Sequence, residues 1–170
     1  MDYIIGIDNG VTGTISILGC DDGGFAQFCK VPCKAPEQDF TRMKKKVVRV
    51  DTARLEELLK PYAKYDSVVV MERPMTNPAR SAAAQQSSMR CLEAELIVIE
   101  RLGLPLHYVS SQEWQKAVMP KGTKTSAELK KASADLGCRY FPFLSAEIRK
   151  HRDADSLLMA MWWGDTHGSK

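Results

Sequence analysis

Apolar and polar positions at the start of the chain follow the pattern of a β-sheet. Residues 3–8 (YIIGID) form an apolar run that ends on an acid. Residues 12–19 and 25–33 are two further strand-like stretches, and short turns rich in Asp, Asn and Gly separate the three. We therefore predict an antiparallel three-stranded meander in this part of the chain.

The remaining pattern is mostly helical, interrupted by two short apolar runs. Residues 67–72 (SVVVME) do not alternate, which indicates a strand covered on both faces. A second run, LHYV at 106–109, follows a Gly-Leu-Pro break. The helices that we predict around these two strands cover residues 52–63, 81–102, a short segment at Trp114, 125–137 and 153–164.

Strands followed by strand–helix–strand units predict an α/β fold. Three antiparallel and then two parallel strands would form a mixed five-stranded sheet flanked by helices on both faces. No repeat or low-complexity linker divides the chain, so we expect one domain over residues 1–170. The N-terminal MDYIIGID lacks the basic start of a secretory signal, and no apolar run approaches the roughly 18 residues of a membrane span. We expect a cytoplasmic protein with no membrane partner.

Three acids stand where an acid is costly among apolar neighbours. Asp8 ends the first strand, Glu72 ends the strand of residues 67–72, and Asp155 opens the apolar last helix. If the two strands are neighbours, Asp8 and Glu72 project from one edge, and the last helix can bring Asp155 across them. Converging carboxylates suit Mg²⁺, or Mn²⁺ in its place, and two such ions about 4 Å apart support phosphodiester cleavage.

Each acid also has a purely structural interpretation. The sequence around Asp8 is typical of a turn, and Glu72 has Arg73 beside it as a candidate ion-pair partner. Asp155 suits a helix N-terminus. The occurrence of all three, in this order on these elements, favours a site.

Four stretches of the chain together resemble one family. They are GIDNGVTGTISIL, VVVMERP, SSQEWQKAVMPKGTKTSAELKKAS and HRDADSLLMAMWW, and they resemble RuvC-type Holliday junction resolvases, which occur in bacteria and phages. The resemblance implies a ribonuclease H-like fold, a homodimer, two Mg²⁺ or Mn²⁺ ions per site, and paired nicks in four-way DNA junctions that leave 5′-phosphates. It assigns metal binding and catalysis to Asp8, Glu72 and Asp155. It also places Lys116 and Lys124 near the scissile phosphate, where Lys124 would stabilise its charge.

The fourth metal ligand is the first departure from the family pattern. Family members often carry Asp or His three residues before the last acid, but this chain has Arg152, flanked by His151 and Asp153. On one continuous helix His151 would share a face with Asp155, whereas Asp153 would not. If Asp153 caps that helix instead, the shared face does not exist. We favour His151, with Asp153 and no fourth ligand as alternatives.

The loop after Glu72 is the second departure. Family members can place an aromatic wedge there, but residues 73–90 contain no aromatic residue, and Met75 is the only apolar candidate of any size. Cleavage of flaps or other branched DNA is therefore an alternative activity. An actin-like sugar-kinase domain is the alternative from another class, because IGIDNGVTGTISIL also resembles its first phosphate loop. One 170-residue chain does not supply both halves of that nucleotide cleft.

The rest of the chain is more positive than its net charge suggests once three acids are assigned to metal binding. The formal net charge is +3, and the remaining 24 basic and 18 acidic residues leave +6. Basic residues gather in 42–49 and 116–131, which favours contact with DNA phosphates. The DNA-binding residues that we expect are Lys116, Lys121, Lys124, Lys130, Lys131, Arg73 and Arg80.

Overall fold

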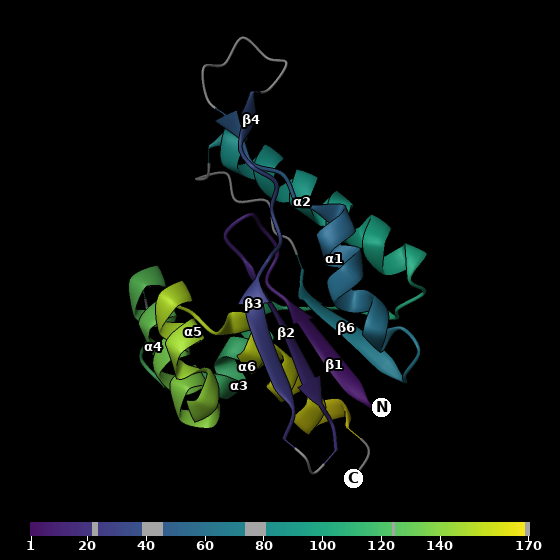
Figure 1. Cartoon of the computed structure of the whole chain (residues 1–170). Helices are drawn as coiled ribbons and strands as arrows, with labels where there is room; N and C mark the ends of the chain where they lie inside the picture. The colour runs from purple at the N-terminus through teal and green to yellow at the C-terminus, as the bar shows by residue number, and fades with distance from the viewer. Residues whose placement is uncertain (22–23, 39–45, 74–80, 124, 169–170) are drawn as a thin grey trace.

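A mixed five-stranded sheet lies at the centre of the structure, a computed structural model (Figure 1). Its strands are β1 (Tyr3–Ile7), β2 (Thr14–Gly19), β3 (Ala26–Lys30), β6 (Ser67–Glu72) and β7 (Leu106–Val109), in the spatial order β3-β2-β1-β6-β7. β2 runs antiparallel to β1 and β3, whereas β6 runs parallel to β1 and β7. The predicted ribonuclease H-like arrangement of three antiparallel and two parallel strands is confirmed. The structure describes residues 1–21, 24–38, 46–73, 81–123 and 125–168.

Helices cover both faces of this sheet, as predicted. One face carries α1 (Thr52–Leu59), continued by the 3₁₀ turn η1 (Lys60–Tyr62), and α2 (Ala82–Arg101). The other carries α6 (Asp155–His167), with α3 (Ser111–Val118), α4 (Ser126–Tyr140) and α5 (Ser145–His151) packed around it. Asp51 and Thr125 accept hydrogen bonds from first-turn N–H groups and so fix where α1 and α4 begin. Within the described ranges, no helix is both long and apolar enough to cross a bilayer.

Two elements were not predicted from the pattern. A short hairpin, β4 (Glu37–Gln38) and β5 (Lys46–Val47), lies between β3 and α1. α5 follows the 3₁₀ turn η2 (Pro142–Leu144), and only Ile148 of α5 is buried, too little to create a periodic signal. α5 ends because Arg152 adopts the left-handed conformation, with φ of 64°. The last helix therefore begins two residues later than predicted.

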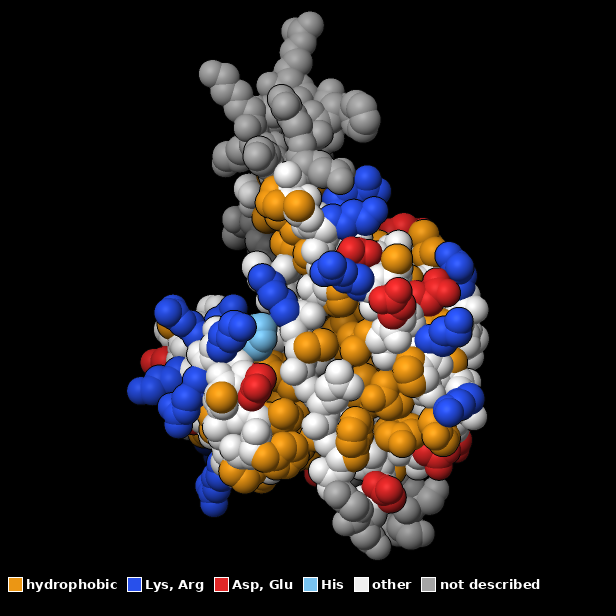
Figure 2. Space-filling view, in the orientation of Figure 1, with side chains coloured by type: hydrophobic (Ala, Val, Ile, Leu, Met, Phe, Trp, Pro, Cys, Tyr) orange, Lys and Arg blue, Asp and Glu red, His pale blue; other side chains and the backbone are white. Residues whose placement is uncertain are grey.

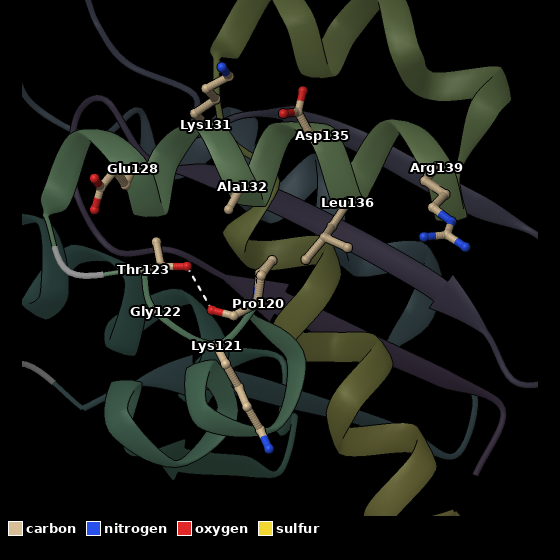
Figure 3. A pocket seen from close by; sticks show the side chains of 10 residues that line it. All are labelled: Pro120, Lys121, Gly122, Thr123, Glu128, Lys131, Ala132, Asp135, Leu136 and Arg139. Carbon is tan, nitrogen blue, oxygen red and sulfur yellow. Dashed lines mark hydrogen bonds between the residues drawn. The ribbon is translucent and has the colours of Figure 1, made fainter.

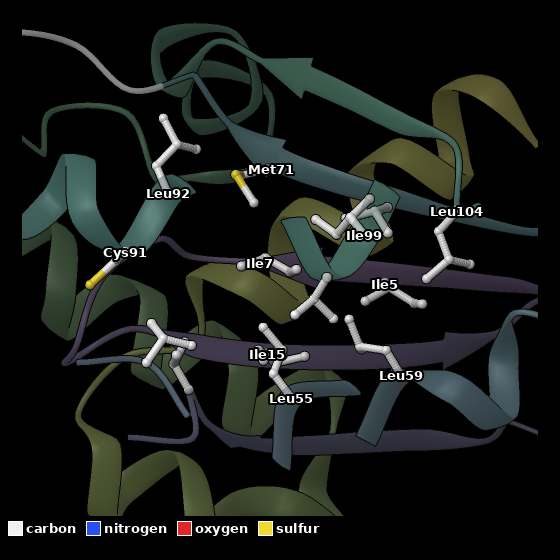
Figure 4. Close-up of a cluster of buried hydrophobic side chains, with 14 of the residues drawn as sticks. Ile5, Ile7, Ile15, Leu55, Leu59, Met71, Cys91, Leu92, Ile99 and Leu104 are labelled. Carbon is white, nitrogen blue, oxygen red and sulfur yellow. The ribbon is translucent and has the colours of Figure 1, made fainter. Parts of the chain in front are cut away.

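Two apolar clusters pack against opposite faces of the sheet. Ile5 and Ile7 of β1 contribute to the cluster under α1 and α2 (Figure 4). Ile4 of β1 and Val70 of β6 contribute to the cluster under α6. Because successive side chains of a strand point to opposite faces, the even-numbered residues of β1 and β6 face α6.

α6 approaches β1 closely at Gly6. A methyl group built on Gly6 would overlap the backbone oxygen of Ser156 in the first turn of α6. The hydroxyl of Ser156 also shares a buried hydrogen bond of 2.9 Å with Thr14 of β2. These contacts place the first turn of α6, which begins with Asp155, over β1 and β2.

We expect Gly6→Ala to lower the free energy of unfolding by about 1–3 kcal/mol, because the new methyl group would force α6 away from β1. The measurement is urea denaturation followed by circular dichroism. Gly164→Ala in α6 is the matched control. Its new methyl group would meet only the end of the Ile4 side chain, 2.9 Å away, which can rotate. Alanine also favours a helix by about 1 kcal/mol, so the control should be neutral or stabilising. Equal losses of stability in the two variants would contradict close packing at Gly6.

Candidate active site

Asp8 and Glu72 lie next to each other at one edge of the sheet. In the parallel pairing of β1 and β6, Ile7 lies opposite Met71. The next residues, Asp8 and Glu72, therefore lie side by side where the two strands end. Both acids occupy even-numbered positions and therefore face α6. The structure thus brings together the two strand-end acids, as expected from the sheet topology.

The junction between α5 and α6 supplies two further acids. Burial, followed by repulsion from Asp155, Asp153 and Glu72, raises the pKa of Asp8 from 3.8 to about 8. Burial also raises the pKa of Asp155 and that of Asp153. Four carboxyl groups therefore interact across one partly buried space.

Asp155 is held in place by α4. Ser133 is fully buried, and its hydroxyl donates a hydrogen bond of 2.5 Å to Oδ1 of Asp155. The same hydroxyl accepts a hydrogen bond of 2.9 Å from the N–H of Ala154. The bond to Asp155 opposes the effect of burial on its pKa. Ser133 was not predicted as a site residue, because a serine within a helix carries no local signal of such a contact.

His151 lies apart from this group of acids. Arg152 ends α5 and α6 begins at Asp155, so His151 and Asp155 do not share the single helical face on which the prediction of His151 was based. The ring of His151 contacts the ring of Phe28 edge-on, with centroids 5.4 Å apart. Burial lowers the pKa of His151, and so do the charges of two lysines, Lys150 and Lys30.

Asp153, the alternative fourth ligand, lies beside Asp155 at the junction between α5 and α6. Its side chain is only 5% exposed, and its Oδ1 has no hydrogen-bond partner. Its charge is among those that raise the pKa of Asp8. An unpartnered buried oxygen beside other carboxylates is typical of a cation ligand. These features make Asp153 a candidate ligand.

Lys130 is a cation close to the acids. Its charge lowers the pKa of Asp8, Asp153 and Asp155. It lies three residues before Ser133, so the two residues share the face of α4 that looks toward the site. Lys130 was predicted as a DNA contact, and the structure adds that its charge acts on three of the candidate metal ligands.

A fifth carboxyl group lies on the other side of the sheet. Glu95 of α2 is completely buried, and a backbone hydrogen bond from Gly10 opposes the effect of burial on its pKa. Burial, followed by the charge of Asp8, raises the pKa of Glu95 to about 8. Glu95 was not predicted as a site residue. The sequence alone does not show that its side of α2 packs against the sheet near Asp8.

The donor set suits a hard divalent cation. Carboxylate oxygens are the ligands that Mg²⁺ and Mn²⁺ prefer, and a bound cation would relieve both the mutual repulsion and the unpartnered oxygen of Asp153. Over the described ranges, no three His, Cys, Asp or Glu side chains are arranged as a formed metal site. The carboxylates would therefore draw closer together around an ion.

The predicted DNA contacts are exposed wherever the structure describes them. Lys and Arg side chains gather on the lobe that contains α4 and α5, at the left of Figure 2. The residues Lys124 and Arg80 and the wedge candidate Met75 lie outside the described residues. The exposed ones are Arg73 after β6, Lys116 in α3, Lys121 in the α3–α4 loop, and Lys130 and Lys131 in α4.

An open pocket of about 490 Å³ lies between the α3–α4 loop and α4 (Figure 3). The loop forms a defined turn, in which the hydroxyl of Thr123 donates a hydrogen bond of 2.7 Å to the carbonyl of Pro120. Charged side chains of both signs line the pocket, namely Lys121, Lys131, Arg139, Glu128 and Asp135. The mixture of charges distinguishes this pocket from the acidic site on the other side of α4.

Comparisons with known proteins bear on the fold. No protein-family model and no curated protein matches the sequence. Among solved structures, the RuvC of T. thermophilus in complex with a Holliday junction substrate matches with a TM-score of 0.61 and 15% identity, over 99% of this chain and 98% of that chain. This chain has the RuvC fold. A second structure, of Thermus thermophilus RuvC, matches with a TM-score of 0.57 and 17% identity over the same shares. The match with RuvC covers nearly all of both chains, so the similarity concerns the whole fold and not the sheet alone.

We expect the stability of the metal-free protein to fall as the pH rises from about 4 to about 8. The pKa of Asp8 is about 8 in the folded state against 3.8 as the ordinary value, so the folded state keeps a proton that the unfolded state releases in this range. Asp8→Asn should flatten the fall and raise the free energy of unfolding at pH 8 by on the order of 1–3 kcal/mol. Urea denaturation in EDTA at several pH values measures both effects.

The control for this experiment is Asp165→Asn, which replaces an exposed carboxylate of α6. It should leave the pH dependence as in the wild type. Mg²⁺ should restore stability at pH 8 in the wild type, and less so in Asp8→Asn. An Asp8→Asn variant with an unchanged pH profile would contradict the assignment of Asp8 to a crowded acidic site.

Proposed function

We propose that this protein is a metal-dependent endodeoxyribonuclease that cuts four-way DNA junctions by paired symmetric nicks and leaves 5′-phosphates. The observation that carries the proposal is the interaction of Asp8, Glu72, Asp153 and Asp155 at one edge of a RuvC-type sheet. The matching RuvC is described as a complex with a Holliday junction substrate, which supports branched DNA as the substrate.

The roles of the residues follow from their positions. Asp8, Glu72, Asp155 and Asp153 would hold two Mg²⁺ ions, which Mn²⁺ could replace. When bound, such ions activate the attacking water and stabilise the leaving oxygen. Ser133 orients the carboxylate of Asp155.

Positive charge near the acids would serve the phosphate. Lys130 already lies beside three of the carboxyl groups. We assign to Lys124 the stabilisation of charge on the scissile phosphate, on the basis of the family resemblance. Phosphate contacts by Lys116, Lys121 and Lys131 would supply affinity that does not depend on base sequence.

Two symmetric nicks require two active sites, so the proposed enzyme is a homodimer. The apolar residues of α2 divide between two roles. Leu92 and Ile99 belong to the core of the chain itself. Met89, which is 52% exposed, and Ile97, which is 46% exposed, remain available for a second subunit. The exposed side of α2 is therefore our candidate for the two-fold interface.

We expect the wild type with Mg²⁺ to cut labelled four-way junctions, with symmetric nicks on a sequencing gel. Asp8→Asn and Glu72→Gln should lower the rate by more than about a hundredfold, because each removes a ligand charge from the site. The control Asp165→Asn should cut at the wild-type rate. Faster cutting of flaps than of junctions would favour the branched-DNA alternative. ATP turnover without DNA cleavage would favour the sugar-kinase alternative, and equal cutting by wild type and Asp8→Asn would refute the site.

We expect DNA binding to weaken steeply with salt. Replacing Lys116, Lys121 and Lys131 by Ala should reduce the slope of log K against log[salt] by up to about 0.9 for each phosphate that a lysine no longer neutralises. Fluorescence anisotropy with a labelled junction in EDTA measures the slope without cleavage. The matched control replaces Arg54, Lys60 and Lys64 near α1, on the opposite face of the sheet. Equal changes in the two triple variants would indicate a general charge effect rather than this surface.

A further inference from the structure

The hydroxyl of Ser133 is wholly engaged with the turn that carries two of the candidate metal ligands. Ser133 is 0% exposed, although a buried hydroxyl gains nothing from burial itself. It donates to Oδ1 of Asp155 and accepts from the N–H of Ala154, residues more than twenty positions later in the chain. A single side chain thus fixes both the carboxylate of Asp155 and the backbone directly before it.

α4 contacts the same turn a second time at Gly137. Gly137 lies one helical turn after Ser133, and a methyl group built on it would overlap the Cβ of Ala154. Ala154, between Asp153 and Asp155, is completely buried. The turn is therefore held by a hydrogen bond at one end and by close packing at the other, which leaves it little room to move relative to α4.

α4 is well suited to act as a rigid support. Its start is fixed by a capping box, in which the Thr125 hydroxyl accepts from the N–H of Glu128 and the Glu128 carboxylate accepts from the N–H of Thr125. Lys130, which interacts with three of the acids, lies on the same face as Ser133. The support for the acids therefore comes from a helix whose first turn is fixed by its own capping interactions.

We propose that Ser133 is a positioning residue that holds Asp155 and the turn of residues 153–155 in the geometry required to bind the divalent cation. The inference rests on the proposed function, because it concerns the metal ligands named there. Without the hydroxyl, Asp155 is free to rotate and the N–H of Ala154 loses its partner. The carboxylates must then be ordered by the ion itself, which weakens its binding. The outer partners of metal ligands typically contribute ten- to a hundredfold to metal affinity.

The test is Mn²⁺ binding to the DNA-free protein, measured by electron paramagnetic resonance. Ser133→Ala should raise the Mn²⁺ dissociation constant about ten- to a hundredfold. Ser133→Thr keeps the hydroxyl and should restore most of the affinity. Ser133→Cys keeps the size with a weaker donor, should give an intermediate value, and replaces the Ala variant if that one does not fold. Cleavage should show a raised midpoint for Mg²⁺, with most of the rate recovered at saturating Mg²⁺.

The matched control is Ser67→Ala, which removes another buried serine hydroxyl, at the start of β6, that donates to the carbonyl of Tyr62 instead. It should lower the melting temperature but change the Mn²⁺ dissociation constant less than about twofold. A wild-type dissociation constant in Ser133→Ala, or an equal shift in Ser67→Ala, would overturn the positioning role. If the wild type cuts junctions and binds Mn²⁺ through Asp8, such a result refutes this inference alone. If the wild type neither binds Mn²⁺ nor cuts DNA, the proposed function fails together with it.

Discussion

The structure depends on one electrostatic constraint, which is the presence of several carboxyl groups in a partly buried space. Burial and mutual repulsion raise the pKa of Asp8 to about 8, so its anionic form is unfavourable unless positive charge arrives. Lys130 and the hydroxyl of Ser133 offset only part of this cost. A pair of divalent cations would offset the rest. The carboxyl groups that are costly to the metal-free fold are thus the same groups that we propose as metal ligands.

The acids can converge only because the elements that carry them approach closely. Gly6 lets the first turn of α6 lie directly on β1, and Gly137 lets α4 lie directly on Ala154. At both places the absent side chain allows a backbone or a methyl group to come within contact distance. The packing of the α6 face therefore sets the geometry of the site, and the two cannot be altered separately.

The same constraint bears on the contact with DNA that we propose. Carboxylates repel phosphate, so the acidic edge would accept a DNA strand only with cations bound. The exposed lysines of the α3–α4 loop and of α4 lie on elements adjoining that edge. α4 contributes to both parts, since Lys131 is exposed to solvent and Ser133 points to the acids. One helix would thus link the proposed surface for phosphate with the support for the proposed metal ligands.

The sequence by itself determined the five strands of the central sheet, their mixed directions and the position of Asp8 and Glu72 at neighbouring strand ends. These features follow from local periodicity and from the pairing of parallel strands. Both can be inferred from the order of residues along the chain. Only the tertiary structure decided that His151 and Asp155 lie on different helices, because the left-handed backbone of Arg152 ends α5 before α6 begins. The buried carboxyl of Glu95 and the hydroxyl bond of Ser133 likewise appeared only in three dimensions. Both arise where a helix docks on segments distant in the chain, and no local pattern records what such a helix will touch.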